Sequence, residues 1–206
     1  IVNKMAKKII HRGPDFSGIC FEENFSLCLA HQRLSILDLS SAGNQPMESF
    51  NQTCIISFNG EIYNFKKLRA KLDLETNINW RGNSDTEVLV NCIEHWGLEK
   101  TLNLSVGMFA FALLDKRKKS LFLARDRFGE KPLYWGFAGS GSTKALVFGS
   151  DISALREFPD FNKEINFKAL DAFMRFSHIP SDLTIYNSIK KLKQWHIAEF
   201  ELENNL

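Results

Sequence analysis

Two periodicities of apolar residues divide the chain into predicted helices and predicted strands. Helical spacing covers residues 2–9, 64–72, 84–97, 151–157 and 166–176. The clearest helix opens on Ser84 and Glu87, the S-x-x-E pattern of a capping box, and ends at Gly97. Between them, Val, Leu, Cys, Ile and Trp side chains form an apolar stripe. The sequence therefore predicts an amphipathic helix over 84–97 that packs on a core.

The strand-like segments are short and are separated by turn residues. They comprise two strands within 16–30 and further strands at 31–39, 54–58, 107–115, 120–126, 133–138, 145–150 and 195–202. The later strands follow one another at hairpin spacing, which favours an antiparallel sheet over alternating βαβ units. Because strands and helices come in separate runs, the predicted fold class is α+β.

Composition narrows the class of protein without naming an activity. A chain of 206 residues with 44% hydrophobic content is the size of one large domain. The formal net charge is +2 and both signs are interspersed, so we expect neither a nucleic-acid partner nor a membrane partner. The four cysteines form no CxxC pair, which is typical of reduced core thiols in the cytoplasm. The five histidines show no ligand spacing, so we expect no metal.

The first residues indicate that natural sequence is missing upstream. The chain does not begin with Met, and a helical pattern begins at Ile1 without a capping residue. At the far end of the same pattern, Gly13 and Pro14 form an ordinary helix stop. We interpret the chain as truncated at its N terminus.

The stretch CIISFNGEIYNF, residues 54–65, leaves two interpretations open. Asn59-Gly60 follows an apolar run and precedes an alternating one, and Asn-Gly is the strongest short hairpin signal because both residues tolerate positive φ. Alternatively, the Asn59 amide and the Gly60 backbone N–H form a pair of donors for an oxyanion. The first interpretation is structural and the second is catalytic.

Six stretches together resemble one known family. They are HRGPD (11–15), HQRLSILDLSSAGNQPM (31–47), FNGEIYN (58–64), SDTE (84–87), GMFAFALLD (107–115) and ARDRFGEKPLY (124–134). Their order and spacing resemble the glutaminase domain of glutamine-hydrolysing asparagine synthetases, a class II amidotransferase of the N-terminal-nucleophile (Ntn) hydrolases. Hexosamine and purine amidotransferases are similar at Asn-Gly and Ser-Asp but carry a different Arg motif in place of HQRLSI.

The resemblance implies a fold and a domain organisation. The fold is a four-layer α-β-β-α sandwich of two antiparallel sheets, and residues 1–206 form one type 2 glutamine amidotransferase domain. In the resembled enzymes an ATP-dependent synthetase domain follows, and its SGG-x-DS signature is absent from this chain. We therefore expect no cofactor for this domain, and ATP and Mg for the missing one. KLKQWH (191–196) replaces the family's usual Pro-Pro-Gly before the His, which puts only that turn in doubt.

The resemblance also implies a mechanism, in which an N-terminal Cys attacks the side-chain amide of glutamine. Its α-amino group, with a pKa of about 8, acts as the base. By resemblance, Asn59 and Gly60 form the oxyanion hole. None of the four cysteines lies near a free amino group by sequence, so we expect this fragment alone to be inactive.

The same resemblance assigns partners to the charged ends of glutamine. Arg33 is the candidate for the α-carboxylate, which a guanidinium binds bidentately. Asp85 and Glu61 are the candidates for the α-ammonium. The backbone of four residues lines the pocket: Leu34, Ser35, Ile36 and Leu37. The alternatives are an ordinary strand-end arginine at Arg33 and a carboxylate that stabilises a helix start at Asp85, worth ~0.3–1 kcal/mol.

A further charged motif receives only a structural interpretation. We expect ion pairing among Arg125, Asp126, Arg127 and Lys131.

The leading hypothesis is the glutaminase half of an amide-forming synthetase that passes ammonia to an ATP-activated carboxylate. One alternative is a degenerate scaffold or binding domain without hydrolysis, and another is an amidotransferase that acts on a sugar acid. An upstream Met-Cys-Gly would favour the enzyme over the scaffold. A homodimer is left open.

Overall fold

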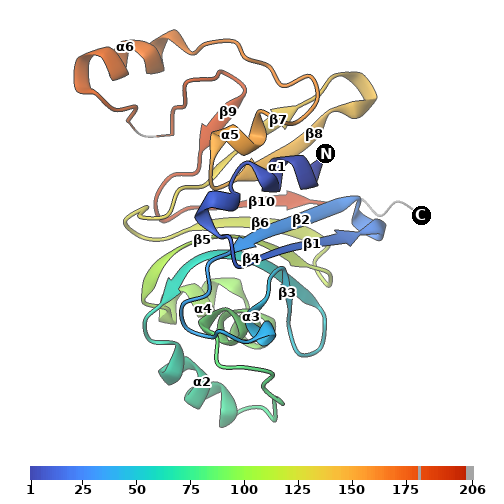
Figure 1. Ribbon diagram of the computed structural model, residues 1–206. Coiled ribbons are helices and arrows are strands. Elements are labelled where there is room, and N and C mark those ends of the chain that lie inside the picture. Colours follow the sequence, from blue (N-terminus) through green and yellow to red (C-terminus); the bar gives the residue numbers. More distant parts are fainter. Residues whose placement is uncertain (181, 203–206) are drawn as a thin grey trace.

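The computed structural model describes residues 1–180 and 182–202, and its centre is a five-stranded antiparallel sheet (Figure 1). The order β10-β6-β5-β4-β3 is formed by β3 (Met47–Glu48), β4 (Cys54–Ile62), β5 (Gly107–Asp115), β6 (Ser120–Arg125) and β10 (Ile197–Glu201). β4 and β5 pair over their whole length, so that Asn59 and Gly60 lie opposite Ala110 and Phe109. The central ladder thus carries the Asn-Gly pair inside a strand.

Three helices cover one face of this sheet, at the bottom of Figure 1. They are α2 (Phe65–Asp73), α3 (Asp85–Trp96) and α4 (Leu98–Leu104). Their apolar side chains pack against alternate strand residues, among them Phe58, Phe109 and Phe111. Since successive side chains of a strand point to opposite faces, Asn59 faces away from these helices. The predicted stripe of α3 is the centre of this core, with Leu89 and Ile93 buried.

Two smaller sheets cover the opposite face of the central sheet. One pairs β1 (Phe16–Glu22) with β2 (Leu27–Arg33), and the other has the order β8-β7-β9, formed by β7 (Tyr134–Ala138), β8 (Ala145–Gly149) and β9 (Ile189–Lys191). Outside them, apolar residues of α1 (Val2–Lys7) and α5 (Ile152–Leu155) pack on β7 and β8. The α+β class and the four layers are confirmed, but the second sheet is divided in two.

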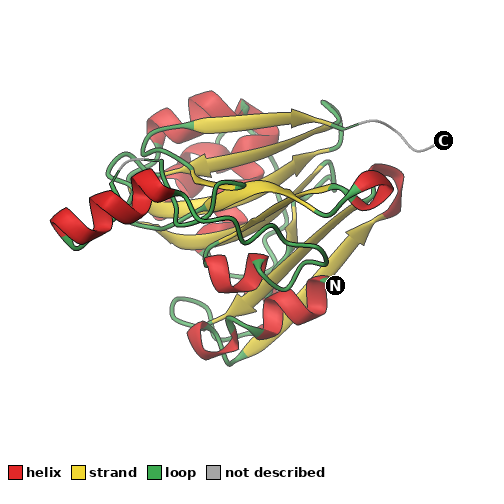
Figure 2. Ribbon diagram, turned by 90° about the horizontal axis from the view of Figure 1, so that it is seen from above, coloured by secondary structure: helices red, strands yellow, loops and turns green. Residues whose placement is uncertain are grey.

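The remaining helices lie outside these layers or are short. α6 (Phe167–Phe176) projects from one end of the molecule (Figure 2). The 3-10 helices are η1 (Ile10–Arg12), η2 (Glu23–Phe25), η3 (Ser41–Gly43) and η4 (Gly141–Thr143). Among the described residues, no helix combines the length and the apolar character that a membrane crossing requires.

Two predictions about local structure are wrong. The strand predicted over 31–39 ends at Arg33, and the apolar side chains that follow are exposed: Leu34, Ile36, Leu37 and Leu39. The hairpin turn at Asn59-Gly60 does not form, because β4 continues through both residues to Ile62. In addition, α4, β3 and β9 were not predicted.

The capping box of α3 forms only in half. The Ser84 hydroxyl accepts the Glu87 N–H at 3.2 Å, as predicted. The buried Glu87 carboxylate accepts instead from the N–H groups of Arg81 and Gly82, at 2.7 and 3.0 Å. The Glu87 side chain therefore holds the segment that precedes the helix, and not the N terminus of the helix itself.

Candidate active site

One cavity of about 280 Å³, called the substrate cavity below, brings the predicted substrate-binding and oxyanion residues together. Its lining includes Arg33, Asn59, Gly60, Glu61 and Asp85. They come from the end of β2, from β4 and from the first turn of α3. These five residues, separated by as many as 52 positions in the sequence, thus share a single cavity.

The loop after β2 lines the cavity through three of its four predicted residues. Leu34, Ile36 and Leu37 are part of the lining. Ser35 is not, and its N–H donates to a carboxylate oxygen of Asp15 at 2.7 Å. The HRGPD motif therefore fixes this loop through Asp15.

Arg33 is buried, with 7% of its surface exposed, so the alternative of an ordinary surface arginine is wrong. Its Nη1 donates to the Ser40 carbonyl at 2.8 Å and to Asn44 Oδ1 at 2.9 Å, and its Nη2 donates to the Asp38 carbonyl. A guanidinium has five N–H groups, so these three bonds leave two for a ligand. Arg33 organises the loop, and its predicted role toward an α-carboxylate remains a prediction.

Asp85 is a buried carboxylate at the start of α3. Its Oδ1 accepts the Thr86 N–H at 2.9 Å and its Oδ2 accepts the Ile62 N–H at 2.8 Å. Desolvation by burial raises the pKa of Asp85, and the charge of Glu61 raises it further. Neither carboxylate forms a salt bridge with any described residue. The cavity therefore presents two neighbouring acidic groups that a bound ammonium group can neutralise.

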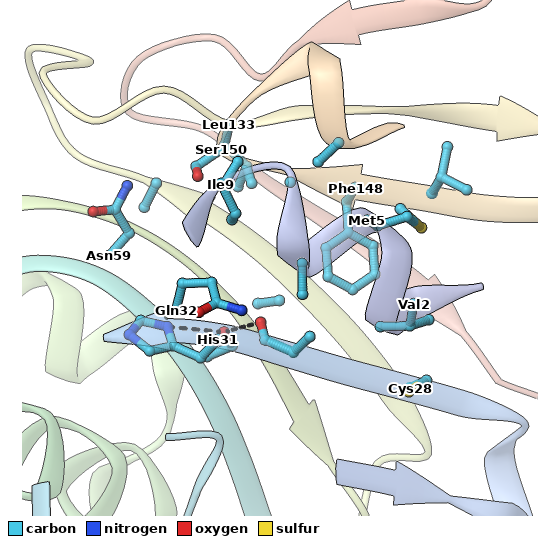
Figure 3. Close-up of a pocket in the computed structure, with 18 of the residues that line it drawn as sticks. Val2, Met5, Ile9, Cys28, His31, Gln32, Asn59, Leu133, Phe148 and Ser150 are labelled. Atoms are coloured by element: carbon cyan, nitrogen blue, oxygen red, sulfur yellow. Dashed lines mark hydrogen bonds between the residues drawn. The ribbon is translucent and has the colours of Figure 1, made fainter. Parts of the chain in front are cut away.

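Asn59 carries a buried donor that has no partner. Its Nδ2 is inaccessible to solvent and forms no hydrogen bond with any described residue. Leaving such a group unsatisfied costs about 1–3 kcal/mol, so a buried free donor that also lines a cavity is a candidate for binding a ligand. Figure 3 shows the Asn59 amide at one end of a second cavity, which Ile9 and Ser150 also line.

This second cavity, of about 300 Å³, is a groove between β2 and β8, each an edge strand of its sheet. α1 covers it, and Ala110 and Ala112 of β5 form part of its floor. Asn59 and His31 lie at one end, and Val2 lies at the other (Figure 3). Both cavities share four lining residues: Arg12, His31, Gln32 and Asn59. The groove and the substrate cavity therefore meet at these four residues, Asn59 among them.

Two lining residues of the substrate cavity, His31 and Gln45, have no role in the sequence predictions. Burial, together with the charge of Arg33, lowers the pKa of His31 to about 4, so the imidazole is neutral at neutral pH. Its Nδ1 lies 3.5 Å from the Ser57 hydroxyl. Neither residue could be found from spacing, because their contacts depend on how the chain folds back on itself.

The cysteines have none of the features of an activated nucleophile. Burial raises the pKa of all four thiols, to about 11 for Cys54 and about 12 for Cys92. A nucleophilic thiol needs a lowered pKa. All four are free thiols, and only Cys28 lines the groove.

The ARDRFGEKPLY motif holds a loop through backbone contacts, so the predicted ion pairing is wrong. The buried Asp126 carboxylate accepts four backbone N–H groups at 3.0–3.2 Å. The Arg125 guanidinium donates to carbonyl oxygens of Gly129, Lys131 and Leu192. Lys131, which lies in this loop, lines the substrate cavity. Across 1–180 and 182–202, no group of three or more His, Cys, Asp or Glu side chains is placed to hold a metal.

Comparisons with known proteins identify the family of this chain. A family profile described as glutamine amidotransferase domain matches residues 1–205. The chain is 36% identical, over 98% of its length, to a putative glutamine-hydrolysing asparagine synthetase 2 of Methanocaldococcus jannaschii, and covers 41% of that protein. It is 35% identical, over 94% of its length, to the glutamine-hydrolysing asparagine synthetase 1 of Bacillus subtilis, and covers 29% of it. The chain thus spans less than half the length of these curated relatives.

A solved structure shares the fold at low sequence identity. It is the glutamine phosphoribosylpyrophosphate amidotransferase from B. subtilis, which matches 92% of this chain and 45% of its own with a TM-score of 0.59 and 18% identity.

Proposed function

The chain belongs to the family of glutamine amidotransferase domains, and from that premise we propose that the substrate cavity binds glutamine and that its carboxamide is hydrolysed beside Asn59. The observation that carries this proposal is the unpartnered Asn59 Nδ2 at the junction of the two cavities. Glu61 and Asp85 take the α-ammonium, and the two remaining N–H groups of Arg33 take the α-carboxylate.

The groove supports the proposed place of the nucleophile. β2 and β8 both run toward its Asn59 end, and α1 begins at its Val2 end. An upstream strand antiparallel to both edges would begin beside Asn59 and end where α1 begins, which satisfies the free edge groups. Its first residue is the proposed Cys. The free amine and thiol of that residue then meet the glutamine carboxamide at the mouth of the groove.

The proposed reaction proceeds in two balanced steps. The Cys thiol gives its proton to its own α-amine, and the thiolate attacks the carboxamide carbon to form a tetrahedral oxyanion. Asn59 Nδ2 and the Gly60 N–H donate to that oxygen. As the C–N bond breaks, the α-ammonium of the Cys gives its proton to the leaving nitrogen. Ammonia departs, and a thioester between the Cys and the glutamyl group remains. Water then adds to the thioester, and glutamate and the thiol are released.

We propose further that the whole protein couples this ammonia to an ATP-activated carboxylate in a covalently linked synthetase domain that uses ATP and Mg. The named relatives are glutamine-hydrolysing asparagine synthetases, so aspartate is the favoured acceptor. A sugar-acid acceptor stays open, because the acceptor site lies outside this chain. The four free thiols suit the reducing cytoplasm that we propose as its location.

The test is glutamate release from glutamine by the protein with its natural upstream sequence. We expect Met-Cys-Gly at the start of the proposed upstream strand, and we expect Asn59→Ala to slow hydrolysis by ~10²–10³-fold. Another residue in place of the Cys would favour the scaffold alternative, since no thiol of this chain replaces it. Full activity in Asn59→Ala would remove the oxyanion role. ATP-dependent product formation with aspartate or with sugar acids then identifies the acceptor.

A further inference from the structure

Gln45 lies between η3 and β3, and its side chain bridges two elements of the site. It is buried, with 7% of its surface exposed, and lines the substrate cavity. Its Oε1 accepts the Phe58 N–H at 2.7 Å, and its Nε2 donates to Thr86 Oγ1 at 3.3 Å. Phe58 immediately precedes Asn59 on β4, and Thr86 immediately follows Asp85 on α3.

The bond to Phe58 lies on the free edge of β4, where the Gly60 donor also lies. Backbone N–H groups of a strand alternate between its two edges, so those of Phe58, Gly60 and Ile62 point the same way. Gln45 occupies the first of the three and Asp85 occupies the third, at 2.8 Å. The Gly60 N–H is the middle one, and Gly60 lines the cavity.

We infer that Gln45 is a positioning residue for glutamine hydrolysis, which sets the place of the Asn59 and Gly60 donors relative to Asp85. Gln45 connects β4 to the first turn of α3 just before the two donors, and Asp85 connects the same two elements just after them. A displacement of about 1 Å between reacting groups can lower a rate by about 10²-fold, so such a double anchor has kinetic consequences. This inference rests on the proposed function.

A matched control distinguishes positioning from ordinary stability. Asn91 is another buried amide, on α3, whose Oδ1 accepts the Phe50 N–H at 2.8 Å and whose Nδ2 donates to the Glu87 carbonyl at 2.8 Å. It bridges the same helix to a backbone segment but does not line the substrate cavity. Gln45→Leu and Asn91→Leu therefore remove comparable bonds at different distances from the donors.

The experiment measures kcat and KM for glutamate release, with thermal unfolding midpoints, in the full-length protein. We expect Gln45→Leu to lower kcat by about 10- to 100-fold with KM within about threefold. Asn91→Leu should lower the midpoint as well, with kcat within about twofold of the unaltered protein. Thr86→Val removes the far end of the bridge and should lower kcat by about 3- to 10-fold. Combined with Gln45→Leu, it should add nothing further.

Each outcome decides the inference. Equal kcat losses in Gln45→Leu and Asn91→Leu would overturn it, as would a raised KM with an unchanged kcat. If Gln45→Leu does not fold, Thr86→Val decides alone, and an unchanged kcat there is the contrary result. A full-length protein that carries the upstream Cys and releases no glutamate would instead refute the proposed function, and the inference with it.

Discussion

Replacing Asn59 by Leu should make the protein more stable and less active. The Asn59 Nδ2 is buried without a partner, which costs the folded state about 1–3 kcal/mol. Leu has a similar branched shape and carries no donor that must be desolvated. The same substitution removes one proposed oxyanion donor, so kcat for glutamate release should fall by ~10²–10³-fold.

The expected shift in the thermal midpoint follows from this stabilisation and from the chain length. If Leu recovers about 1 kcal/mol, the thermal midpoint of a chain of 206 residues should rise by about 2–4 °C. Differential scanning calorimetry of the unaltered protein and of Asn59→Leu measures this shift, and a coupled glutamate assay measures kcat on the same samples. Both changes should occur together in one variant.

Thr101 supplies the matched control for this experiment. Its Oγ1 is the other buried side-chain polar atom without a hydrogen-bond partner in the described part of the chain, and it lies on α4, outside both cavities. Thr101→Val should raise the midpoint similarly and leave kcat unchanged. A lower midpoint in Asn59→Leu with full activity would refute the reasoning that the free donor is held for catalysis.

Three further changes test other parts of the site. Gly60→Ala places a Cβ against the Met108 carbonyl, so we expect a loss of about 1–3 kcal/mol in unfolding free energy, seen as a lower urea midpoint. Arg33→Lys loses the planar fork that holds three loop acceptors, so KM for glutamine should rise by about 10-fold or more in steady-state assays. The raised pKa of Asp85 means that protonation begins above the usual carboxyl range as pH falls, and the protonated acid no longer pairs with the α-ammonium. Glutamine affinity should therefore weaken as pH falls through this raised pKa, and Asp85→Asn should weaken affinity while removing Asp85's contribution to that pH dependence in calorimetric titrations. An unaltered midpoint, KM or pH profile, respectively, would contradict each expectation.

The sequence predicted those elements whose signals are local. The stripe and the Ser84 cap of α3 lie within one stretch of 13 residues, and the helix forms as expected from Asp85 to Trp96. The Asn-Gly turn signal is equally local, but it competes with a ladder in which all of β4 pairs with β5. Tertiary pairing is stronger than a turn preference, so the strand continues.

The predicted strand over 31–39 failed for a related reason. Alternating apolar residues after Arg33 imitate a half-buried strand, but no described strand pairs with them. Arg33 and Asp38 organise the segment instead, Arg33 through carbonyl groups and Asp38 through the N–H groups of Ser40 and Asn83. Charged groups that are satisfied by backbone groups, as the buried Arg33 and the partly exposed Asp38 are, fold a loop without giving it a periodic sequence.

Of the site, only the residues that belong to recognised sequence motifs could be predicted. Arg33, Gly60 and Asp85 were identified from resemblance and do line one cavity, but the sequence showed nothing of the bonds that hold them. The free edge of β4 explains why. Of its three N–H groups around the site, those of Phe58 and Ile62 are taken by side chains 13 and 23 positions away, which leaves the middle group facing the cavity. The proposed oxyanion donor of Gly60 is thus left free because its two neighbours are satisfied, and no spacing rule in a single sequence encodes that.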